Sequence, residues 1–371
     1  MEPRHSLRDK VGIIPCEGMD EMSMQLDSIQ HGITILICCH NSSSRLPTVL
    51  EHLLRQDAPA TISWEVLVID NASSDATSDT ARSVWPHRHP VPLRVVLEPN
   101  LGLTNARNRG IGEAKYDIIS FVDDDNWVEP EFVKAVHWLM QNRPEMGACG
   151  GRIEEVCEVE PPDWFDAFKV ALALSPKEET YGWISDPDKY LPGAGLSIRQ
   201  TALRDILALG FTPTLAGRSG KSLLSGEDLE LGAALRLAGW KLWREESVTI
   251  KHFMPAGRLT WSYMKRLYYG FGASGFSPYE VLLFAKGSHL KQRLKTTFLW
   301  QVLFTAKRGL RAILREAQIG SESVQGRVLQ LERAWFAGRL SYLIRNWSAC
   351  RKNRKAALSF LKACATARGE T

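Results

Sequence analysis

Three consecutive aspartates, Asp123, Asp124 and Asp125, follow the apolar run at residues 118–122. A short apolar run of this kind is typical of a strand buried in a sheet. Side chains alternate along an extended chain, so Asp123 and Asp125 are expected on one side and Asp124 on the other. Neighbouring carboxylates repel unless a cation lies between them, and Mg²⁺ or Mn²⁺ commonly uses one or two carboxylates together with substrate phosphates. The alternative interpretation is a solvated acidic turn that binds nothing.

A second acidic pair, Glu227 and Asp228, lies between Gly226 and a helical pattern at residues 229–238. Acids in the first turn of a helix are stabilised by the helix dipole, so the pair has an ordinary structural interpretation. The functional interpretation is a general base at the rim of a cleft, with its pKa set by burial and by neighbouring charges. The adjacent residues do not distinguish the structural interpretation from the functional one.

The elements that position these acids alternate between strand and helix patterns. Short apolar runs predict strands at residues 33–39, 65–69, 93–97, 117–122 and 248–250. Helical spacing predicts helices at residues 47–54, 103–114, 201–209 and 229–238. Such alternation predicts an open α/β sheet, in which ligands bind beyond the carboxyl ends of the strands. Asp70 ends the second strand, so it is expected at the same edge as the three acids.

The composition suits one large domain with an appendage, because 44% of the 371 residues are hydrophobic. The seven cysteines are scattered and include no CxxC pair, so we expect reduced thiols in a cytoplasmic protein and no zinc site. Residues 1–31 lack the apolar core of a signal peptide. No apolar stretch has the length of a membrane-spanning helix.

Several short segments, taken in order, resemble family 2 glycosyltransferases with the GT-A fold. They are residues 35–41 (ILICCHN), 68–75 (VIDNASSD), 100–108 (NLGLTNARN), 121–125 (FVDDD), 193–195 (GAG), 227–228 (ED) and Arg236. The resemblance covers roughly residues 32–255. It implies an α/β fold with a mixed, mostly parallel open sheet flanked by helices. It also implies an inverting transfer of a sugar from a nucleotide-diphospho-sugar to a hydroxyl of a glycan or lipid-linked acceptor, with Mg²⁺ or Mn²⁺ as cofactor.

Applied residue by residue, the resemblance implies a donor site, a metal site and a catalytic pair. The residues implied to bind the nucleotide-sugar are Cys39, Asn41, Asp70, Arg107, Asp123, Asp124, Gly193, Ala194 and Gly195. The metal would be held by Asp123, Asp125 and His252, although a lone histidine also has an ordinary packing interpretation. Asp228 would be the base that deprotonates the acceptor hydroxyl, and Glu227 would shape the acceptor side.

The sequence departs from the family pattern at one point, and two other functions are compatible with parts of it. Residues 42–45 lack the acid that the family often has after the first strand. A sugar nucleotidyltransferase would normally have a glycine-rich phosphate loop there, and residues 39–45 contain no glycine. A non-catalytic scaffold that binds sugar nucleotides would not need the Glu227–Asp228 pair. Three aromatic residues, Trp164, Trp183 and Tyr190, would either stack on an acceptor sugar or pack in the core.

The C-terminal region is strongly basic. Residues 286–371 contain 18 Lys and Arg residues against four Glu, whereas the whole chain has 46 basic and 42 acidic residues. Such a split indicates an acidic body joined to a basic region with its own partner. We therefore divide the chain into an N-terminal extension (1–31), a glycosyltransferase domain (32–285) and a basic helical region (286–371).

Within the basic region, residues 298–315 predict an amphipathic helix. Its apolar face is predicted to contain Leu299, Val302, Leu303, Ala306, Leu310, Ile313 and Leu314, with Arg308, Arg311 and Arg315 opposite. Three interpretations remain open: docking on an anionic membrane surface, packing on the domain, and binding of nucleic acid, which is the least favoured. Membrane docking would place a cytoplasmic protein peripherally on the inner face of the cytoplasmic membrane.

Overall fold

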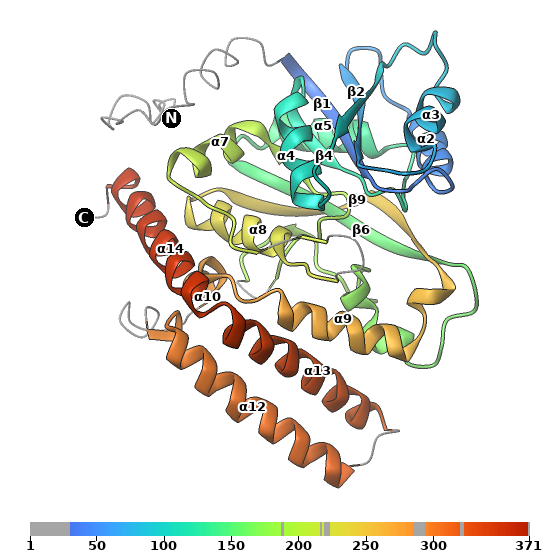
Figure 1. Ribbon diagram of the computed structural model, residues 1–371. Coiled ribbons are helices and arrows are strands. Elements are labelled where there is room, and N and C mark those ends of the chain that lie inside the picture. Colours follow the sequence, from blue (N-terminus) through green and yellow to red (C-terminus); the bar gives the residue numbers. More distant parts are fainter. Residues whose placement is uncertain are drawn as a thin grey trace.

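Strands and helices alternate along the first half of the chain, and three long helices end it, as Figure 1 shows for the computed structural model. The structure describes residues 30–186, 189–215, 217–218, 223–284, 294–319 and 323–369. Residues 1–29, most of the predicted N-terminal extension, lie outside the described residues. So does the predicted boundary between the domain and the basic region at residue 286.

The strands of the described residues form one mixed sheet in the order β3-β2-β1-β4-β8-β6-β9-β5, with β7 paired to β9. Their bounds are β1 (Gln30–Cys39), β2 (Trp64–Asn71), β3 (Leu93–Glu98), β4 (Tyr116–Phe121), β5 (Asn126–Val128), β6 (Met146–Cys157), β7 (Gly182–Trp183), β8 (Ser197–Arg199) and β9 (Lys241–Met254). Strands β3, β2, β1 and β4 pair in parallel, as do β6 and β9, whereas β5, β7 and β8 pair antiparallel. The predicted α/β class with a mixed, mostly parallel sheet flanked by helices is confirmed.

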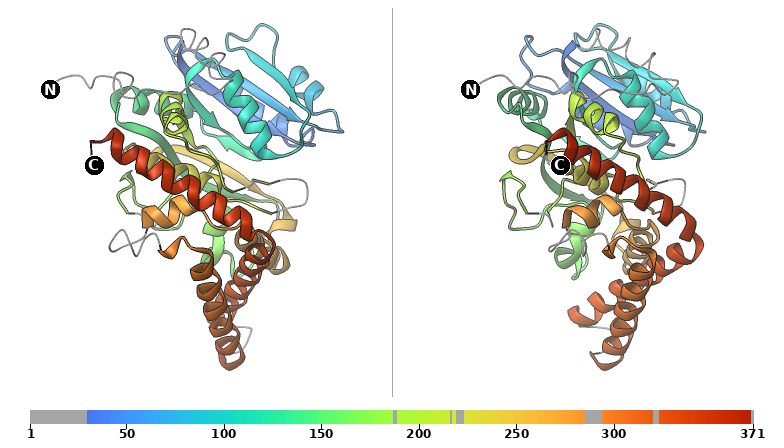
Figure 2. Two further views of the ribbon diagram at one scale, coloured as in Figure 1. Left: turned by 60° about the vertical axis from the view of Figure 1, so that its left-hand side comes forward. Right: turned by 90° about the vertical axis from the view of Figure 1, so that its left-hand side faces the viewer.

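Helices cover both faces of this sheet (Figures 1 and 2). The helices of the domain are α2 (Leu46–Leu54), α3 (Thr77–Val84), α4 (Leu103–Glu113), α5 (Phe132–Asn142), α6 (Phe165–Phe168), α7 (Gln200–Ala208), α8 (Glu227–Leu237), α9 (Trp261–Ala273) and α10 (Pro278–Phe284). Two short 3₁₀ turns, η3 (Lys169–Leu172) and η4 (Ala256–Arg258), precede the loop to β7 and helix α9 respectively. The predicted helices 47–54, 103–114, 201–209 and 229–238 correspond to α2, α4, α7 and α8.

Alternation along β1 explains why the sheet is buried on both faces. Ile35 and Ile37 belong to the apolar cluster beneath α2 and α5, whereas Leu36 belongs to the cluster that contains residues of α4, α7 and α8. All three side chains are almost completely buried. A strand covered on both sides needs a continuous apolar run, which is the pattern that the sequence has.

The carboxyl ends of β1, β2 and β4 lie at one edge of the sheet because these strands run in parallel. Strand β4 ends at Phe121, and the amide of Asn126 donates to the carbonyl oxygen of Asp123 at 3.0 Å, which closes a turn. The three aspartates therefore lie in a turn. The expected alternation of Asp123 and Asp125 against Asp124 is wrong, because it holds only for an extended strand.

The basic region forms three helices, α12 (Phe298–Ile319), α13 (Val324–Arg345) and α14 (Trp347–Ala367). Helices α12 and α13 project from the body as a pair, and α14 lies along the body (Figure 2). The ring of Phe360 in α14 lies 5.5 Å from the ring of Tyr279 in α10, so α14 is part of the core. No helix among the described residues combines the length and the hydropathy needed to cross a bilayer.

Helix α13 packs very closely on α9 through glycines. A Cβ atom on Gly272 would lie 1.9 Å from the carbonyl oxygen of Trp335, and one on Gly338 would lie 2.1 Å from that of Tyr269. Only glycine permits backbones to approach so closely. Helices α13 and α14 therefore pack on the domain, which is one of the interpretations that the sequence left open.

Candidate active site

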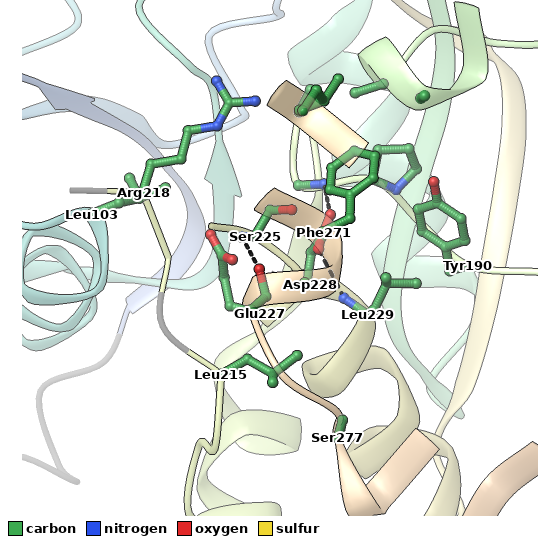
Figure 3. Close-up of a pocket in the computed structure, with 18 of the residues that line it drawn as sticks. Leu103, Tyr190, Leu215, Arg218, Ser225, Glu227, Asp228, Leu229, Phe271 and Ser277 are labelled. Carbon is green, nitrogen blue, oxygen red and sulfur yellow. Dashed lines mark hydrogen bonds between the residues drawn. The ribbon is translucent and has the colours of Figure 1, made fainter. Parts of the chain in front are cut away.

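A cavity of about 920 Å³ lies between the carboxyl edge of the sheet and the C-terminal helices. Its wall includes the ends of β1 and β2, the aspartate turn, the loop at residues 190–194, the start of α8 and parts of α9, α12 and α13. Figure 3 shows the part around the start of α8, with Glu227, Asp228 and Tyr190. Elements far apart in the sequence thus meet in one site at the strand ends, where an α/β sheet binds its ligands.

Asp228 lies in the first turn of α8, behind Gly226, whose φ of +112° turns the chain into the helix. Its Oδ2 atom accepts a hydrogen bond from the amide of Gly193 at 2.8 Å. This bond joins the start of α8 to the loop before β8 and fixes the direction of the carboxylate. The Glu227–Asp228 pair therefore has a role beyond starting α8, because the carboxylate of Asp228 is held by a hydrogen bond from another wall of the cavity.

Glu227 lies beside Asp228 and is paired with Arg107 of α4. The distance from Arg107 Nη1 to Glu227 Oε1 is 3.3 Å. The second oxygen, Oε2, is buried and has no hydrogen-bond partner among the described residues. Burial raises the pKa of Glu227, with Arg107 opposing the shift and the charge of Asp228 adding to it. An unpaired buried carboxylate oxygen costs free energy, and a bound hydroxyl would remove that cost.

The first two aspartates of the turn each face an arginine. Asp123 lies 4.0 Å from Arg107 and remains partly exposed. Asp124 accepts hydrogen bonds from Arg45, at 2.6 Å, and from Ser42. Burial raises the pKa of Asp124, together with the charge of Asp125, while Arg45 opposes the shift. Asp124 therefore anchors the segment between β1 and α2, in which the family often has an acid.

Asp125 and His252 are brought together by the pairing of β5 with β9, in which Asn126 lies opposite His252. The distance from Asp125 Oδ1 to His252 Nε2 is 3.5 Å. Arg258, in the turn η4, donates to Asp125 Oδ2 at 2.8 Å and lies 3.1 Å from His252 Nε2. Burial acts against ionisation of Asp125, but the charges of His252 and Arg258 hold its pKa well below its usual range.

The fit of a divalent cation can be judged from these donors. A carboxylate and an imidazole are suitable ligands for Mn²⁺ or Mg²⁺ when phosphates complete the shell. The Nδ1 atom of His252 is buried without a partner among the described residues, so a ligand or water is needed there. Asp123 does not join the pair, since the described residues contain no group of three such side chains that could hold an ion. Asp125 and His252 fit the cation in donor type, and Arg258 now contacts the same two side chains.

Five arginines line the cavity: Arg339 of α13 and four of the domain, Arg45, Arg107, Arg218 and Arg258. Guanidinium groups match phosphate oxygens in geometry and stay charged at any physiological pH. Of the five, the sequence had assigned a role only to Arg107. Arg218 and Arg258 lie in a loop and a short turn without a motif, and no spacing rule could have identified them.

The predicted nucleotide residues of β1 and β2 divide into two groups. Cys39 and its neighbour Cys38 line the cavity, and burial raises the pKa of Cys38 to about 12, so its thiol is neutral. Asn41 and Asp70 are absent from the described lining. Asn41 has a φ of +52° and accepts from the amide of Ser74 at 2.8 Å, while Asp70 accepts from nearby residues of the loop after β2. Both shape the loops behind the site.

The glycine loop, residues 193–195, lies against Arg107 and Asp228. A Cβ on Gly193 would lie 3.0 Å from Arg107 Nη2, so a larger residue would press on that side chain. Ala194 lines the cavity, and Gly195 has a φ of +70° and no room for a side chain beside Ile250. The loop therefore packs closely on Arg107 at Gly193, and the close approach of donor and acceptor sugars there stays a prediction.

Only one of the three aromatic residues singled out in the sequence contributes to the described cavity wall. Tyr190 lines it, and burial, reinforced by the charge of Asp228, raises the pKa of Tyr190 to about 12. Trp164 packs edge-on against Trp261, and Trp183 packs against Trp243. The core-packing interpretation therefore holds for Trp164, which is buried, whereas Trp183 is exposed and packs at the surface.

Comparison with known proteins identifies the family. Residues 34–207 match the family described as glycosyl transferase family 2, a segment that includes Arg107, Asp123–Asp125 and Gly193–Gly195. Residues 34–207, a little under half of the chain, carry the family 2 glycosyltransferase match. The predicted family and the enzyme class, a glycosyltransferase, are confirmed.

Curated relatives of this glycosyltransferase are similar over limited lengths. The putative glycosyltransferase EpsH of Bacillus subtilis (strain 168) is 29% identical over 100 residues, which cover 27% of this chain and 28% of that protein. The poly-beta-1,6-N-acetyl-D-glucosamine synthase of Staphylococcus aureus (strain COL) is 29% identical over 153 residues, or 40% of this chain and 32% of that protein. The chain thus spans about a third or less of the length of these relatives.

Among solved structures, the crystal structure of S. aureus TarS 1-349 in complex with UDP-GlcNAc has a TM-score of 0.48 and 15% sequence identity. The alignment covers 84% of this chain and 91% of that one.

Proposed function

We propose that this glycosyltransferase moves a sugar from a nucleotide-diphospho-sugar to a hydroxyl of a glycan or lipid-linked acceptor, with inversion at the anomeric carbon. The observation that carries the proposal is the placement of Asp228. Its carboxylate is fixed by the amide of Gly193 in a cavity that five arginines also line. A fixed base and a cationic wall are the two parts that such a transfer needs.

Asp228 is the proposed general base. It takes the proton of the acceptor hydroxyl as that oxygen forms a bond to the anomeric carbon. The bond from that carbon to the diphosphate breaks on the opposite face, and its electron pair leaves with the diphosphate. The unpaired Oε2 atom of Glu227 accepts a hydrogen bond from a second hydroxyl group of the acceptor substrate. This hydrogen bond positions the acceptor sugar. A positioned base of this kind contributes about 10²–10⁴-fold to the rate.

The arginine wall stabilises the leaving group. Arg107, Arg218 and Arg258 line the cavity and supply fixed positive charge where charge develops on the diphosphate. Asp125 and His252 are the residues that would hold a divalent cation, with Asp123 at the ribose. When bound there, the cation would supply further neutralisation of the diphosphate. Cys39, Arg107, Asp123 and Asp124 form the proposed nucleotide side, while Asn41 and Asp70 support its loops.

A thermal-shift panel tests the donor site. UDP, GDP, TDP and CDP and their sugars are added with and without Mn²⁺, and UDP-N-acetylglucosamine comes first because a relative is named for a polymer of that sugar. A ligand at a hundred times its Kd stabilises the protein by about 2.7 kcal/mol. One nucleotide should raise the melting temperature of the protein. If part of this increase requires Mn²⁺, Asp125→Asn should remove that part. No shift with any nucleotide contradicts the donor site.

The stereochemistry has its own test. Proton NMR of the first product formed distinguishes the two anomers, and inversion predicts the anomer opposite to that of the donor. Retention of the donor's configuration would contradict the assignment of Asp228 as the base for direct attack.

A further inference from the structure

Helix α12 turns its apolar face away from the protein. We call this its outward face, and it consists of Leu299, Leu303, Ala306, Leu310, Ile313 and Leu314. Leu299, Leu303 and Leu310 are 66%, 61% and 58% exposed. In Figure 1, α12 is the outer helix of the pair that it forms with α13. A continuous row of exposed leucines of this length marks an interaction site.

The opposite face of α12, which contacts α13, is polar or small. Its buried members are Gln301, Thr305 and Ala312. Gln301 accepts a hydrogen bond from Arg339 of α13 at 2.8 Å, and Arg339 itself is buried. Rotating α12 to bury its leucines would leave that guanidinium without this partner, at a high cost in free energy. The orientation of α12 is therefore specified by the sequence.

Basic residues flank the outward face along one side. Lys307, Arg311 and Arg315 are spaced by four residues, so they form one row on the helix. All three are exposed, and no carboxylate of the described residues forms a salt bridge with them. Arg308 lies farther round and contacts Glu332 at 3.9 Å. Leucines beside a row of unpaired cations are the arrangement of a helix that lies in the surface of an anionic membrane.

The cavity reaches this helix. Its wall contains both Asp228 and the aromatic residues Trp300, Phe304 and Trp335. Trp300 and Phe304 are themselves partly exposed and lie on the basic side of the outward face. An acceptor can therefore extend from the catalytic carboxylate to the surface from which the leucines project.

We propose that α12 docks on an anionic lipid bilayer through its outward face, and that the acceptor reaches Asp228 from that bilayer as a lipid-linked molecule. The second half of this inference rests on the proposed glycosyl transfer, whereas the first half does not. Charge complementarity selects the bilayer over a second copy of this chain, because the one carboxylate of α12, Glu316, already pairs with Arg333 at 3.0 Å and leaves no acid on this helix for a partner's cations.

Co-sedimentation of the full chain with vesicles tests the docking. Vesicles of pure phosphatidylcholine are compared with vesicles of phosphatidylcholine and phosphatidylglycerol at 7:3. We expect binding to the anionic vesicles, lowered about 100-fold in the combined variant Lys307→Gln, Arg311→Gln, Arg315→Gln. The combined variant Leu303→Gln, Leu310→Gln, Leu314→Gln should lose at least as much.

Two matched controls make the result specific to α12. Arg351→Gln, Lys352→Gln, Lys355→Gln removes the same charge from exposed positions of α14. Leu97→Gln, Val159→Gln, Leu207→Gln removes exposed apolar side chains elsewhere. Both should bind as the unaltered chain does. Equal loss in the α14 variant would overturn the docking face, and so would a lipid-free dimer that the leucine variant dissociates.

The acceptor is tested separately, by transfer of label from radioactive UDP-N-acetylglucosamine to a bacterial membrane lipid extract. Label should enter the butanol phase, and less of it should do so with the lysine and arginine variant of α12. Asp228→Asn should bind vesicles normally and transfer label about 10²–10⁴-fold more slowly, which separates docking from catalysis. Transfer only to water-soluble acceptors by a vesicle-bound enzyme overturns the lipid-linked acceptor and leaves the proposed function standing.

Discussion

The amide nitrogen of Gly193 lies 2.8 Å from Oδ2 of Asp228, although the two residues are 35 positions apart in the chain. The bond aligns the carboxylate without adding a positive charge beside it. The amide of Leu229 donates to the other oxygen, Oδ1, at 2.9 Å. A base must point at its substrate and remain able to accept a proton, and neutral backbone donors satisfy both needs. The relationship makes Asp228, rather than Glu227 with its arginine partner, the base in our proposal.

Asp228→Asn tests that assignment. The amide keeps the shape and cannot take the proton, so turnover should fall by about 10²–10⁴-fold while donor binding is retained. Initial rates and donor Kd are measured together. Glu227→Gln is the companion variant, and its main effect should be a higher KM for the acceptor. Full turnover in Asp228→Asn would remove Asp228 from the role.

Arg258→Ala should change divalent-cation binding in the absence of donor. Removal of the guanidinium frees Asp125 and His252 from the contacts that Arg258 makes at 2.8 and 3.1 Å. We expect Mn²⁺ to bind about tenfold more tightly, a difference of about 1.4 kcal/mol, as measured by electron paramagnetic resonance of free Mn²⁺. Arg266→Ala removes an exposed arginine from the adjacent helix α9 and should change nothing. Unchanged affinity in Arg258→Ala would contradict the view that the arginine and the cation compete.

Glu280 predicts a pH dependence of stability. Burial, with the charge of Glu230 adding to it, raises the pKa of Glu280 from 4.5 to about 8. Between these two values the folded protein keeps the proton and the unfolded chain releases it. The free energy of unfolding therefore falls as pH rises through this window, by at most about 1.4 kcal/mol per pH unit.

Glu280→Gln should flatten that dependence, because a neutral side chain has no proton to lose. The melting temperature of the variant should fall less between pH 5 and pH 8 than that of the unaltered chain. Glu98→Gln, at the end of β3, is the control and should keep the original slope. Parallel melting curves for Glu280→Gln and the unaltered chain would show that Glu280 ionises normally.

Gly272→Ala should destabilise the contact between α9 and α13. Its new Cβ would meet the carbonyl oxygen of Trp335 at 1.9 Å, so α13 would have to shift. We expect a loss of about 1–3 kcal/mol in chemical denaturation, the usual cost of overpacking. Gly112→Ala in α4 is the control, since nothing lies within 4 Å of its Cβ position. That variant should be stabilised by up to about 1 kcal/mol.

Much of the sheet and its edge could be predicted from local patterns. The apolar runs at residues 33–39 and 65–69 gave β1 and β2, because strands covered on both faces must be apolar throughout. The sites at residues 123–125 and 227–228 followed from their places at strand and helix ends. These are features of neighbouring residues, and a sequence records them directly.

The contacts across the cavity could not be predicted in the same way. Arg258 reaches Asp125 because β5 and β9 pair, and neither a period nor a spacing in the sequence encodes that distance. The alternation predicted for Asp123 and Asp125 was wrong because β4 ends at Phe121, two residues before the first acid. The apolar residues of α12 were predicted correctly except for Val302, which packs against the protein, and only the structure shows that the others face outward.

The polar inner face of α12 has a consequence for local unfolding. Beyond Val302, Ala312 is the only buried apolar side chain of this helix among those described. Hydrophobic contact therefore contributes little to holding its second half on α13, and that half should exchange its amide hydrogens before the sheet does. Trp300 and Phe304 lie near the start of α12 and form part of the cavity wall. Local unfolding of α12 in water would thus increase the mobility of the cavity wall at Trp300 and Phe304. Contact with lipid would stabilise the helix and order this part of the wall.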